Sequence, residues 1–377
     1  MKIAIDARFL GPEGTGVGKY VEKLIENLEQ LDQQNEYYII LRKANFHLFN
    51  PKSKNFKKVL LDANWYSIKE QLLVPAGLSK IRPNLVHFPH FNIPLIYPGR
   101  FVVTIHDTTT SEFGGISSTT KTWPILFLKQ AAYRIALGQG IRRARKIFTP
   151  SEFVKKKLLK TFSLPTEKIT VTYEAPDEIF IQAGKESLSE GKEKQVLATY
   201  GISKPFILYV GNAFPYKNLD NLLQVLTLID RKISLSYVGG RSGFVYRLGK
   251  KAKDFGIDDR LIVTGFVPNE DLAVLYKLAS CFVFPSRSEG FGLPGIEAMA
   301  SGCPVVCSNI PVFKEVYGEA ALYFDPEKPK DIAEKIELIM KNSELKTDLI
   351  KKGLEQVKKY SWRKLAKETL KVYKELA

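Results

Sequence analysis

Two carboxylates near the middle of the second half of the chain are the side chains best placed to do chemistry. The short apolar run 280–284 predicts a buried strand, because it is brief, rich in β-prone residues and followed by proline. A glycine-containing loop follows, and then a helix that starts near Pro294. Glu289 is therefore expected in a strand-to-helix loop, and Glu297 about one turn into the helix.

This arrangement suits a ligand with both phosphate and hydroxyl groups. Backbone N–H groups of the loop 290–292 and of the helix start can face an anion, while carboxylates accept hydrogen bonds from hydroxyls. A diphosphate between two polyhydroxylated rings, as in a sugar nucleotide, fits this chemistry. Taken alone, Glu289 is equally well a solvated loop residue and Glu297 a charge favoured by the helix dipole.

Lys217 is a second candidate, after the strand-like run 205–211 and next to a predicted helix start. A cation at that end of a helix is disfavoured by the helix dipole. It becomes favourable if it neutralises a diphosphate.

His106 and Asp107 form a third candidate group, at the end of the strand-like run 101–105. Ligands of open α/β sheets bind outside the carboxyl ends of the strands. The pair is either an acid–base group or a hydrogen-bonded strand end, and the residues alone leave both open.

A glycine-rich turn, 11–18, follows the first predicted strand, Lys2 to Asp6, and such turns can bind phosphate. It is not a Walker loop, because Glu13 stands at the first required glycine and Tyr20 replaces the Mg²⁺-binding hydroxyl. It also lacks Gly-x-Gly-x-x-Gly, which excludes a dinucleotide fingerprint. By itself the pattern indicates only a tight turn.

The sequence Ser-Glu-Gly-Phe-Gly-Leu-Pro at 288–294, with Glu-Ala-Met-Ala at 297–300, resembles a signature of the retaining GT-B glycosyltransferases of glycosyltransferase family 4. This group includes many bacterial mannosyltransferases. Further similarities lie in Asp-Ala-Arg at 6–8 with 15–20, and in 146–153. The last helix, from Tyr-Ser-Trp at 360–362, resembles the family's C-terminal helix.

The resemblance implies roles for the candidate residues. Glu297 would hold the ribose hydroxyls, Glu289 the sugar hydroxyls and Lys217 the phosphates, with His106 beside the sugar and Asp107 a candidate acceptor contact. The family usually carries an arginine near the lysine, but the matching positions hold Asn212 and Tyr216, so Arg241 is the candidate replacement. The catalytic set implied is His106, Lys217 and Glu289. The donor-binding set implied is Gly16, Gly18, Gly211, Asn212, Arg241, Val267, Gly290, Phe291, Gly292, Leu293 and Glu297.

Length and pattern predict two α/β domains, since 377 residues exceed one ordinary core and strands alternate with helices. The resemblance implies the GT-B fold: two Rossmann-like domains with parallel sheets facing a central cleft. We expect an acceptor-side domain at 1–180, a polar linker within 174–204 and a nucleotide-sugar domain at 205–355. Residues 356–377 are expected to form a helix that crosses back to the first domain.

Composition limits the class of partner. The net charge of +16 calls for anions: nucleic acid, a membrane surface or phosphorylated substrates. The run 121–146 is either an amphipathic segment at a membrane surface or, our first expectation, a packed helix. The early charge and the lack of a long apolar run predict a cytoplasmic protein. Cys281, Cys303 and Cys307 are expected to be buried thiols.

The function expected is retaining, metal-independent transfer of a hexose to a glycan or lipid-linked glycan in cell-surface polysaccharide synthesis. The donor would be GDP-mannose or a UDP-sugar, with no cofactor and no Asp-x-Asp metal motif, and membrane contact would be peripheral. Two alternatives remain: a GT-B enzyme that uses a nucleotide sugar without transfer, such as an epimerase, and a basic nucleic-acid-binding protein. No nucleic-acid recognition module is visible for the second.

Overall fold

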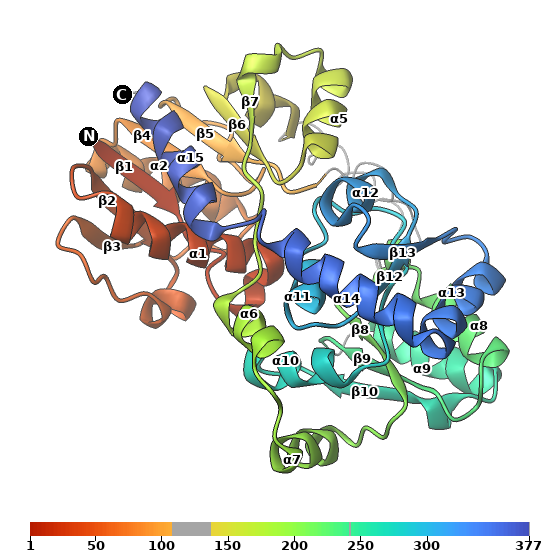
Figure 1. The fold of residues 1–377 in the computed structure, drawn as a ribbon. Coiled ribbons are helices and arrows are strands. Elements are labelled where there is room, and N and C mark those ends of the chain that lie inside the picture. The colour runs from red at the N-terminus through yellow and green to blue at the C-terminus, as the bar shows by residue number, and fades with distance from the viewer. Residues whose placement is uncertain (108–136, 241–242, 377) are drawn as a thin grey trace. The chain divides into compact units, whose positions relative to one another are not determined.

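The computed structural model describes residues 1–107, 137–240 and 243–376. They form two compact units, and Figure 1 follows the chain through them by colour. The first unit contains the described residues up to 174 together with the last helix, and the second contains those from 175 to 360. Among the described residues, the chain passes from the first unit to the second after Glu174 and returns to the first unit at Ser361.

Within the described residues, the first unit is built on a sheet of seven parallel strands in the order β3-β2-β1-β4-β5-β6-β7. The strands are β1 (Lys2–Asp6), β2 (Glu36–Leu41), β3 (Phe56–Leu60), β4 (Leu85–Phe88), β5 (Phe101–Thr104), β6 (Lys146–Thr149) and β7 (Ile169–Val171). The central strands β4 and β5 are buried over their whole length and are mostly apolar, with His87 and Thr104 as their polar residues.

The α-helices that lie wholly within the described residues of this unit are α1 (Thr15–Leu31), α2 (Ile68–Ile81), α5 (Glu152–Phe162) and α15 (Trp362–Glu375). Ser67, Ser151 and Ser361 cap the last three, each accepting a hydrogen bond from the backbone N–H three residues on. Val74 and Leu78 of α2 pack into the core of the sheet with the strand residues Val86 and Val103. Helix α15 packs against α1, and Figure 1 shows the two side by side.

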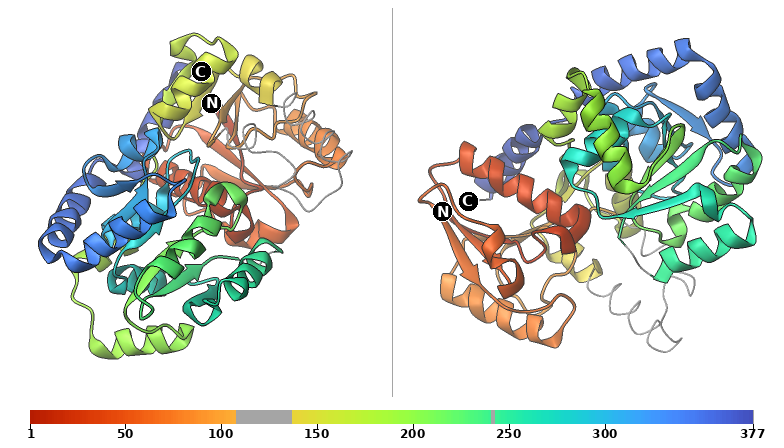
Figure 2. Two further views of the ribbon diagram at one scale, coloured as in Figure 1. Left: turned by 90° about the vertical axis from the view of Figure 1, so that its right-hand side faces the viewer. Right: turned by 90° about the horizontal axis from the view of Figure 1, so that it is seen from below.

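The second unit contains a sheet of six parallel strands in the order β10-β9-β8-β11-β12-β13. The strands are β8 (Phe206–Val210), β9 (Ser234–Val238), β10 (Leu261–Gly265), β11 (Phe282–Phe284), β12 (Val305–Ser308) and β13 (Ala321–Phe324). The helices are α6 (Glu178–Lys185), α7 (Glu190–Tyr200), α8 (Leu219–Leu228), α9 (Gly243–Asp254), α10 (Asn269–Leu278), α11 (Leu293–Ala300), α12 (Pro311–Tyr317), α13 (Pro329–Lys341) and α14 (Ser343–Val357). Helix α8 packs on α9 and α13, whereas α10 packs on α6 and α11; Figure 2 shows helices on both sides of this sheet.

The region expected to be a polar linker, 174–204, is largely helical instead. It contains α6 and α7, and the division between the units falls between Glu174 and Ala175. Its polar composition is misleading because α6 buries one phenylalanine, Phe180, against Tyr276 of α10 with ring centres 5.8 Å apart. Gly184 lets α6 approach α11, since a Cβ there would lie 2.1 Å from the carbonyl oxygen of Ala300.

Two smaller expectations also meet the structure. All three cysteines are buried and free of disulfides, as expected, and burial raises the pKa of Cys281 to about 12. Residues 121–136 of the amphipathic run 121–146 lie outside the described residues. Of the remainder, residues 137–143 are helical. A search of the described helices finds none with the length and apolar character to cross a membrane.

Candidate active site

Each sheet has a point where the strand order reverses, between β1 and β4 in the first unit and between β8 and β11 in the second. Ligands of open α/β sheets bind at such points, outside the carboxyl ends of the strands. Loops from these strand ends carry the charged groups described below.

In the second unit, Lys217 and Glu289 come from the two sides of this switch point and meet. Lys217 ends a 3-10 turn, Pro215–Lys217, that follows β8, and Glu289 lies in the loop after β11. Lys217 Nζ lies 2.5 Å from Glu289 Oε1, and the two side chains are 12% and 13% exposed. A mostly buried ion pair therefore stands at the carboxyl edge, with one cation available to a phosphate and one carboxylate available to hydroxyls.

The turn that carries Lys217 is held from two directions. Asn218, buried and left-handed at φ 61°, donates its side-chain N–H to the carbonyl oxygen of Pro326 at 2.7 Å. The backbone N–H of Arg287 donates to the carbonyl oxygen of Tyr216 at 2.8 Å, while its guanidinium pairs with Glu327 at 2.5 and 2.8 Å. Arg287 thus anchors the turn to the loop of Glu289. The sequence analysis missed it, although it directly precedes the motif at 288–294, because Glu327 is 40 residues away.

The start of α11 is shaped by a buried tyrosine beneath two glycines. Gly292, at φ 93°, precedes the helix, and its carbonyl oxygen accepts the hydroxyl of Tyr317 at 2.5 Å. A Cβ at either Gly292 or Gly295 would lie 2.3 Å from that hydroxyl oxygen. No side chain caps this helix start. Pro294 has no N–H and the N–H of Gly295 donates to Gly292 O at 3.0 Å, so the N–H of Leu293 is the one among the first three helical residues that suits an anion. Glu297 lies one turn into the helix and is half-buried. Burial is the largest cause that raises the pKa of Tyr276, and the charge of Glu297 is the next largest.

Glycines stand at the carboxyl ends of β8, β9 and β10, on the strands next to the Lys217 turn: Gly211, Gly239 and Gly265. We call them the glycine strip. Gly239 donates its N–H to Gly265 O at 3.1 Å, and a Cβ on Gly239 would lie 2.0 Å from Gly211 O. Asn212 follows with an exposed side chain. Val267 is only 4% exposed, so a ligand would meet its backbone rather than its side chain.

The other residues of the predicted donor-binding set differ in how exposed they are. Phe291 is 4% exposed and packs edge-on to Tyr360 with ring centres 5.5 Å apart, so its side chain belongs to the core. Gly290 is buried and Leu293 is half-buried at the start of α11. Arg241, the predicted replacement for the family's arginine, lies outside the described residues.

In the first unit, both ring nitrogens of His106 face oxygen atoms. Nε2 donates to the carbonyl oxygen of Pro89 at 2.9 Å, and Nδ1 lies 3.2 Å from Glu174 Oε1. Because the carbonyl can only accept, Nε2 carries a proton, and Nδ1 is the ring nitrogen that faces the carboxyl group of Glu174. Glu174 was missed because it was assigned to the linker, although it follows β7 as His106 follows β5.

A buried chain of hydrogen bonds lies behind His106. Tyr20, whose ring stands edge-on to His106 at 4.8 Å, shares a hydrogen bond of 3.0 Å with Thr104, and Thr104 one of 2.7 Å with His87. The other nitrogen of His87 lies 2.5 Å from the hydroxyl of Tyr373 in α15. Burial, and then the nearby His106, lower the pKa of His87 to about 3, so this histidine is neutral and structural.

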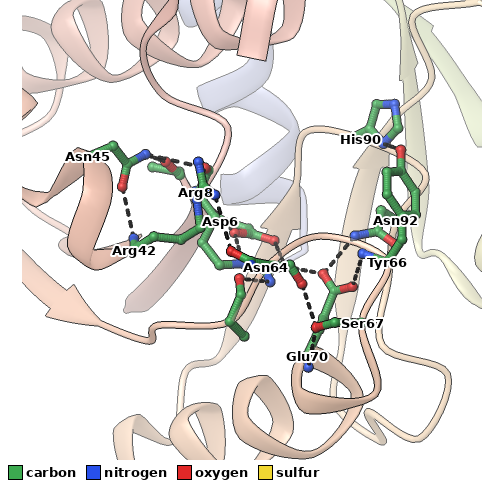
Figure 3. A network of polar contacts seen from close by, with 12 residues as sticks. Asp6, Arg8, Arg42, Asn45, Asn64, Tyr66, Ser67, Glu70, His90 and Asn92 are labelled. Carbon is green, nitrogen blue, oxygen red and sulfur yellow. Dashed lines mark hydrogen bonds and ion pairs between the residues drawn. The ribbon is translucent and has the colours of Figure 1, made fainter. Parts of the chain in front are cut away.

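A second buried network, drawn in Figure 3, fixes the loops after β1 and β3. Arg8, fully buried, pairs with Asp6 at 2.7 Å and with Glu70 at 2.6 Å, and Asn92 donates to the same carboxylate at 2.6 Å. Burial raises the pKa of Glu70, and the charge of Arg8 opposes this. Arg42 extends the network by donating to the carbonyl oxygen of Arg8 at 3.2 Å.

The glycine-rich turn differs from the prediction, because α1 already begins at Thr15. Gly16 and Gly18 therefore lie in the first turn of the helix rather than in a loop. Gly18 has a packing reason, since a Cβ would lie 2.4 Å from Gly11 O, whereas Gly16 faces open space. Asp107 is half-buried next to His106. Among residues 1–107, 137–240 and 243–376, no group of three or more His, Cys, Asp or Glu side chains is arranged to hold a metal ion.

Two family models match the chain on either side of the division between the units. The model described as Glycosyltransferase Family 4 matches residues 14–177, and that described as Glycosyl transferases group 1 matches residues 193–356. The O-antigen chain mannosyltransferase RfbU of Salmonella typhimurium is 27% identical, with 94% of each chain covered. The O-antigen chain mannosyltransferase B of Escherichia coli is 28% identical, with 96% of each chain covered.

Solved structures agree on the fold. Sucrose-phosphate synthase from Thermosynechococcus elongatus superposes with a TM-score of 0.80 at 19% identity, covering 100% of this chain and 99% of the other. WaaG, a glycosyltransferase involved in lipopolysaccharide biosynthesis, gives a TM-score of 0.75 at 13% identity, covering 99% of each. With its two parallel sheets and its two family matches, which together cover most of the chain, the protein belongs to the GT-B glycosyltransferases of family 4.

Proposed function

We propose that this glycosyltransferase moves a hexose, mannose in preference, from a nucleotide sugar to a glycan or lipid-linked glycan during cell-surface polysaccharide synthesis. The observation that carries the donor site is the Lys217–Glu289 pair beside the glycine strip and the uncapped start of α11. The preference for mannose, with GDP-mannose as donor, draws on the two O-antigen mannosyltransferases that are similar over nearly the whole chain.

The transfer proposed is retaining. The acceptor oxygen attacks C1 of the sugar on the face from which the diphosphate departs, and the acceptor proton passes to a phosphate oxygen of the leaving group. Lys217 and the N–H of Leu293 at the start of α11 would stabilise the negative charge that develops on that diphosphate. We propose that these groups suffice without a metal ion, and that the enzyme works at the cytoplasmic face of the membrane that holds its acceptor.

A thermal-shift panel of GDP, UDP, ADP and their sugar conjugates in EDTA tests the donor site. A nucleotide at 100 times its Kd adds about 2.7 kcal/mol of stability, which is readily measured. We expect GDP and GDP-mannose to raise the melting temperature of the wild-type protein and of Lys232→Ala, which removes an exposed lysine. No shift with any nucleotide, with or without Mg²⁺, would refute the donor site.

The anomer of the first sugar released from the donor tests retention without knowledge of the acceptor. Slow hydrolysis of the α-linked GDP-mannose, followed by proton NMR, should give α-mannose before mutarotation. The β anomer as first product would refute retention. A new epimer of the sugar in place of free mannose would identify an enzyme that does not transfer.

A further inference from the structure

A cluster of cations surrounds an open depression of about 510 Å³ in the first unit, at the amino ends of β5 and β6. His106 follows the opposite, carboxyl end of β5, so the depression is at the other edge of the sheet. One carboxylate, Glu167, is among the lining residues, and it is exposed. The cations that line it are Arg100, Arg142, Arg143, Arg145, Lys146 and Lys168.

The charges of this cluster are not balanced by ion pairs to carboxylates within the part of the chain that the structure describes. The two lysines donate to backbone carbonyls instead: Lys146 to Glu167 at 2.7 Å and Lys168 to Arg142 at 2.8 Å. Burial lowers the pKa of Lys168. Arg100, Arg142 and Arg145 have exposed side chains. A concave surface of one sign of charge attracts anions.

An apolar stripe is linked to this cluster through the loop before β5. Ile68 and Leu72, one turn apart on α2, are 83% and 61% exposed, and Ile96 on the loop before β5 is 61% exposed. The loop is joined to α2 because Leu95 donates its N–H to the side chain of Gln71 at 2.8 Å. It is joined to the cluster because Arg143 donates to Leu95 O at 2.6 Å. Exposed apolar side chains in such a group mark an interaction surface.

We propose that the cation cluster and the apolar stripe together form a docking face for a bilayer that contains anionic lipid. Ile68, Leu72 and Ile96 would enter the boundary of the acyl chains, while the cations meet headgroup phosphates. This pairing of exposed aliphatic side chains with unpaired cations distinguishes a bilayer from nucleic acid, whose backbone would use the cations but not the aliphatic stripe. The inference rests on the proposed function, because a lipid-linked acceptor has to be met at a membrane.

Co-sedimentation with vesicles tests the face. The wild-type protein should bind vesicles of phosphatidylcholine with 30% phosphatidylglycerol more strongly than phosphatidylcholine alone. Arg142→Gln with Arg145→Gln should weaken that binding at least tenfold, and Leu72→Ser with Ile96→Ser should weaken it comparably. The matched control is Lys232→Gln with Lys253→Gln, which removes the same charge from exposed positions of the second unit and should leave binding within twofold.

Three further outcomes would overturn the proposal. The first is that the control variant loses as much vesicle binding as the arginine variant, which would indicate that the net charge of the protein alone drives binding. The second is stabilisation by inorganic phosphate, lost in the arginine variant, with no vesicle binding, which would indicate a site for a free anion. The third is binding of duplex DNA without vesicle binding. GDP should raise the melting temperature of the wild type and of all these variants equally. If GDP does not stabilise the wild type, that result counts against the donor site and not against this docking face.

Discussion

At the scale of single residues, the Lys217–Glu289 pair predicts opposite effects of its two members on nucleotide binding. Replacing Glu289 by Gln leaves the charge of Lys217 uncompensated, so GDP should bind equally well or up to about tenfold more tightly, while turnover falls at least about 100-fold. Replacing Lys217 by Ala removes a charged hydrogen-bond donor, so GDP should bind about 10- to 100-fold more weakly. Isothermal titration and donor-hydrolysis rates measure both.

The controls for this pair are simple. Lys232→Ala should leave GDP affinity unchanged, since its side chain is exposed. If Glu289→Gln and Lys217→Ala weakened GDP binding equally, the division of roles between phosphate and sugar would be contradicted.

Residues whose role depends on local spacing could be predicted from the sequence, and residues whose role depends on a distant partner could not. Glu289, Glu297 and Lys217 were singled out by their position in motifs. Glu174 and Arg287 are recognisable only once the chain brings Glu174 to His106, 68 residues apart, and Glu327 to Arg287. Burial cannot be read from a single residue either. The side chain of Phe291 is packed, so the donor-binding role that the resemblance implies for this residue would fall to its backbone.

At the scale of elements, the turn between β8 and α8 depends on Asn218. Asn218→Ala loses both a hydrogen bond and a residue type tolerant of φ 61°, and should destabilise the protein by about 2–3 kcal/mol. Asn218→Gly keeps the backbone freedom and loses only the hydrogen bond, about 1 kcal/mol. Because Lys217 precedes it directly, both variants should weaken GDP binding, with alanine the more severe. Urea unfolding and titration with GDP give the two quantities.

Asn221 provides the matched control for this turn. It also donates to Pro326 O, at 2.8 Å, but lies within α8, beyond the turn. Asn221→Ala should therefore reduce stability modestly and leave GDP affinity unchanged. A loss of GDP affinity as large as that of Asn218→Ala would show that the loop of Pro326, and not the conformation of Asn218, positions Lys217.

The strands of both sheets could be predicted well because parallel strands buried on both faces read as short apolar runs. The predicted strands 2–6 and 101–105 match β1 and β5 within one residue. Helix starts were less certain where glycine dominates, as at Thr15, because packing of Gly18 against Gly11 O, and not a loop, explains those glycines. Helix α7 was missed because it buries a single residue, Val196.

At the scale of the whole molecule, each of the two units contains a fully buried tyrosine whose hydroxyl makes a hydrogen bond. The return of α15 to the first unit brings Tyr373 there. Tyr373 and Tyr317 are both fully buried, and their hydroxyls lie 2.5 Å from His87 Nδ1 and from Gly292 O respectively. Tyr373→Phe and Tyr317→Phe therefore make the same chemical change in two units. Each should reduce the stability of its own unit by about 1–3 kcal/mol, because each leaves a buried polar atom without its partner.

Hydrogen exchange followed by mass spectrometry locates these effects, since exchange reports local opening free energies along the chain. Tyr373→Phe should speed exchange in β4 and β5 and leave GDP affinity unchanged, because its hydrogen bond lies wholly within the first unit. Tyr317→Phe should speed exchange in α11 and β12 and weaken GDP binding, because it supports Gly292 at the start of α11. Equal acceleration in all four elements by either variant would show that the two units open as one, and that the C-terminal helix stabilises the donor site as well as the sheet it packs on.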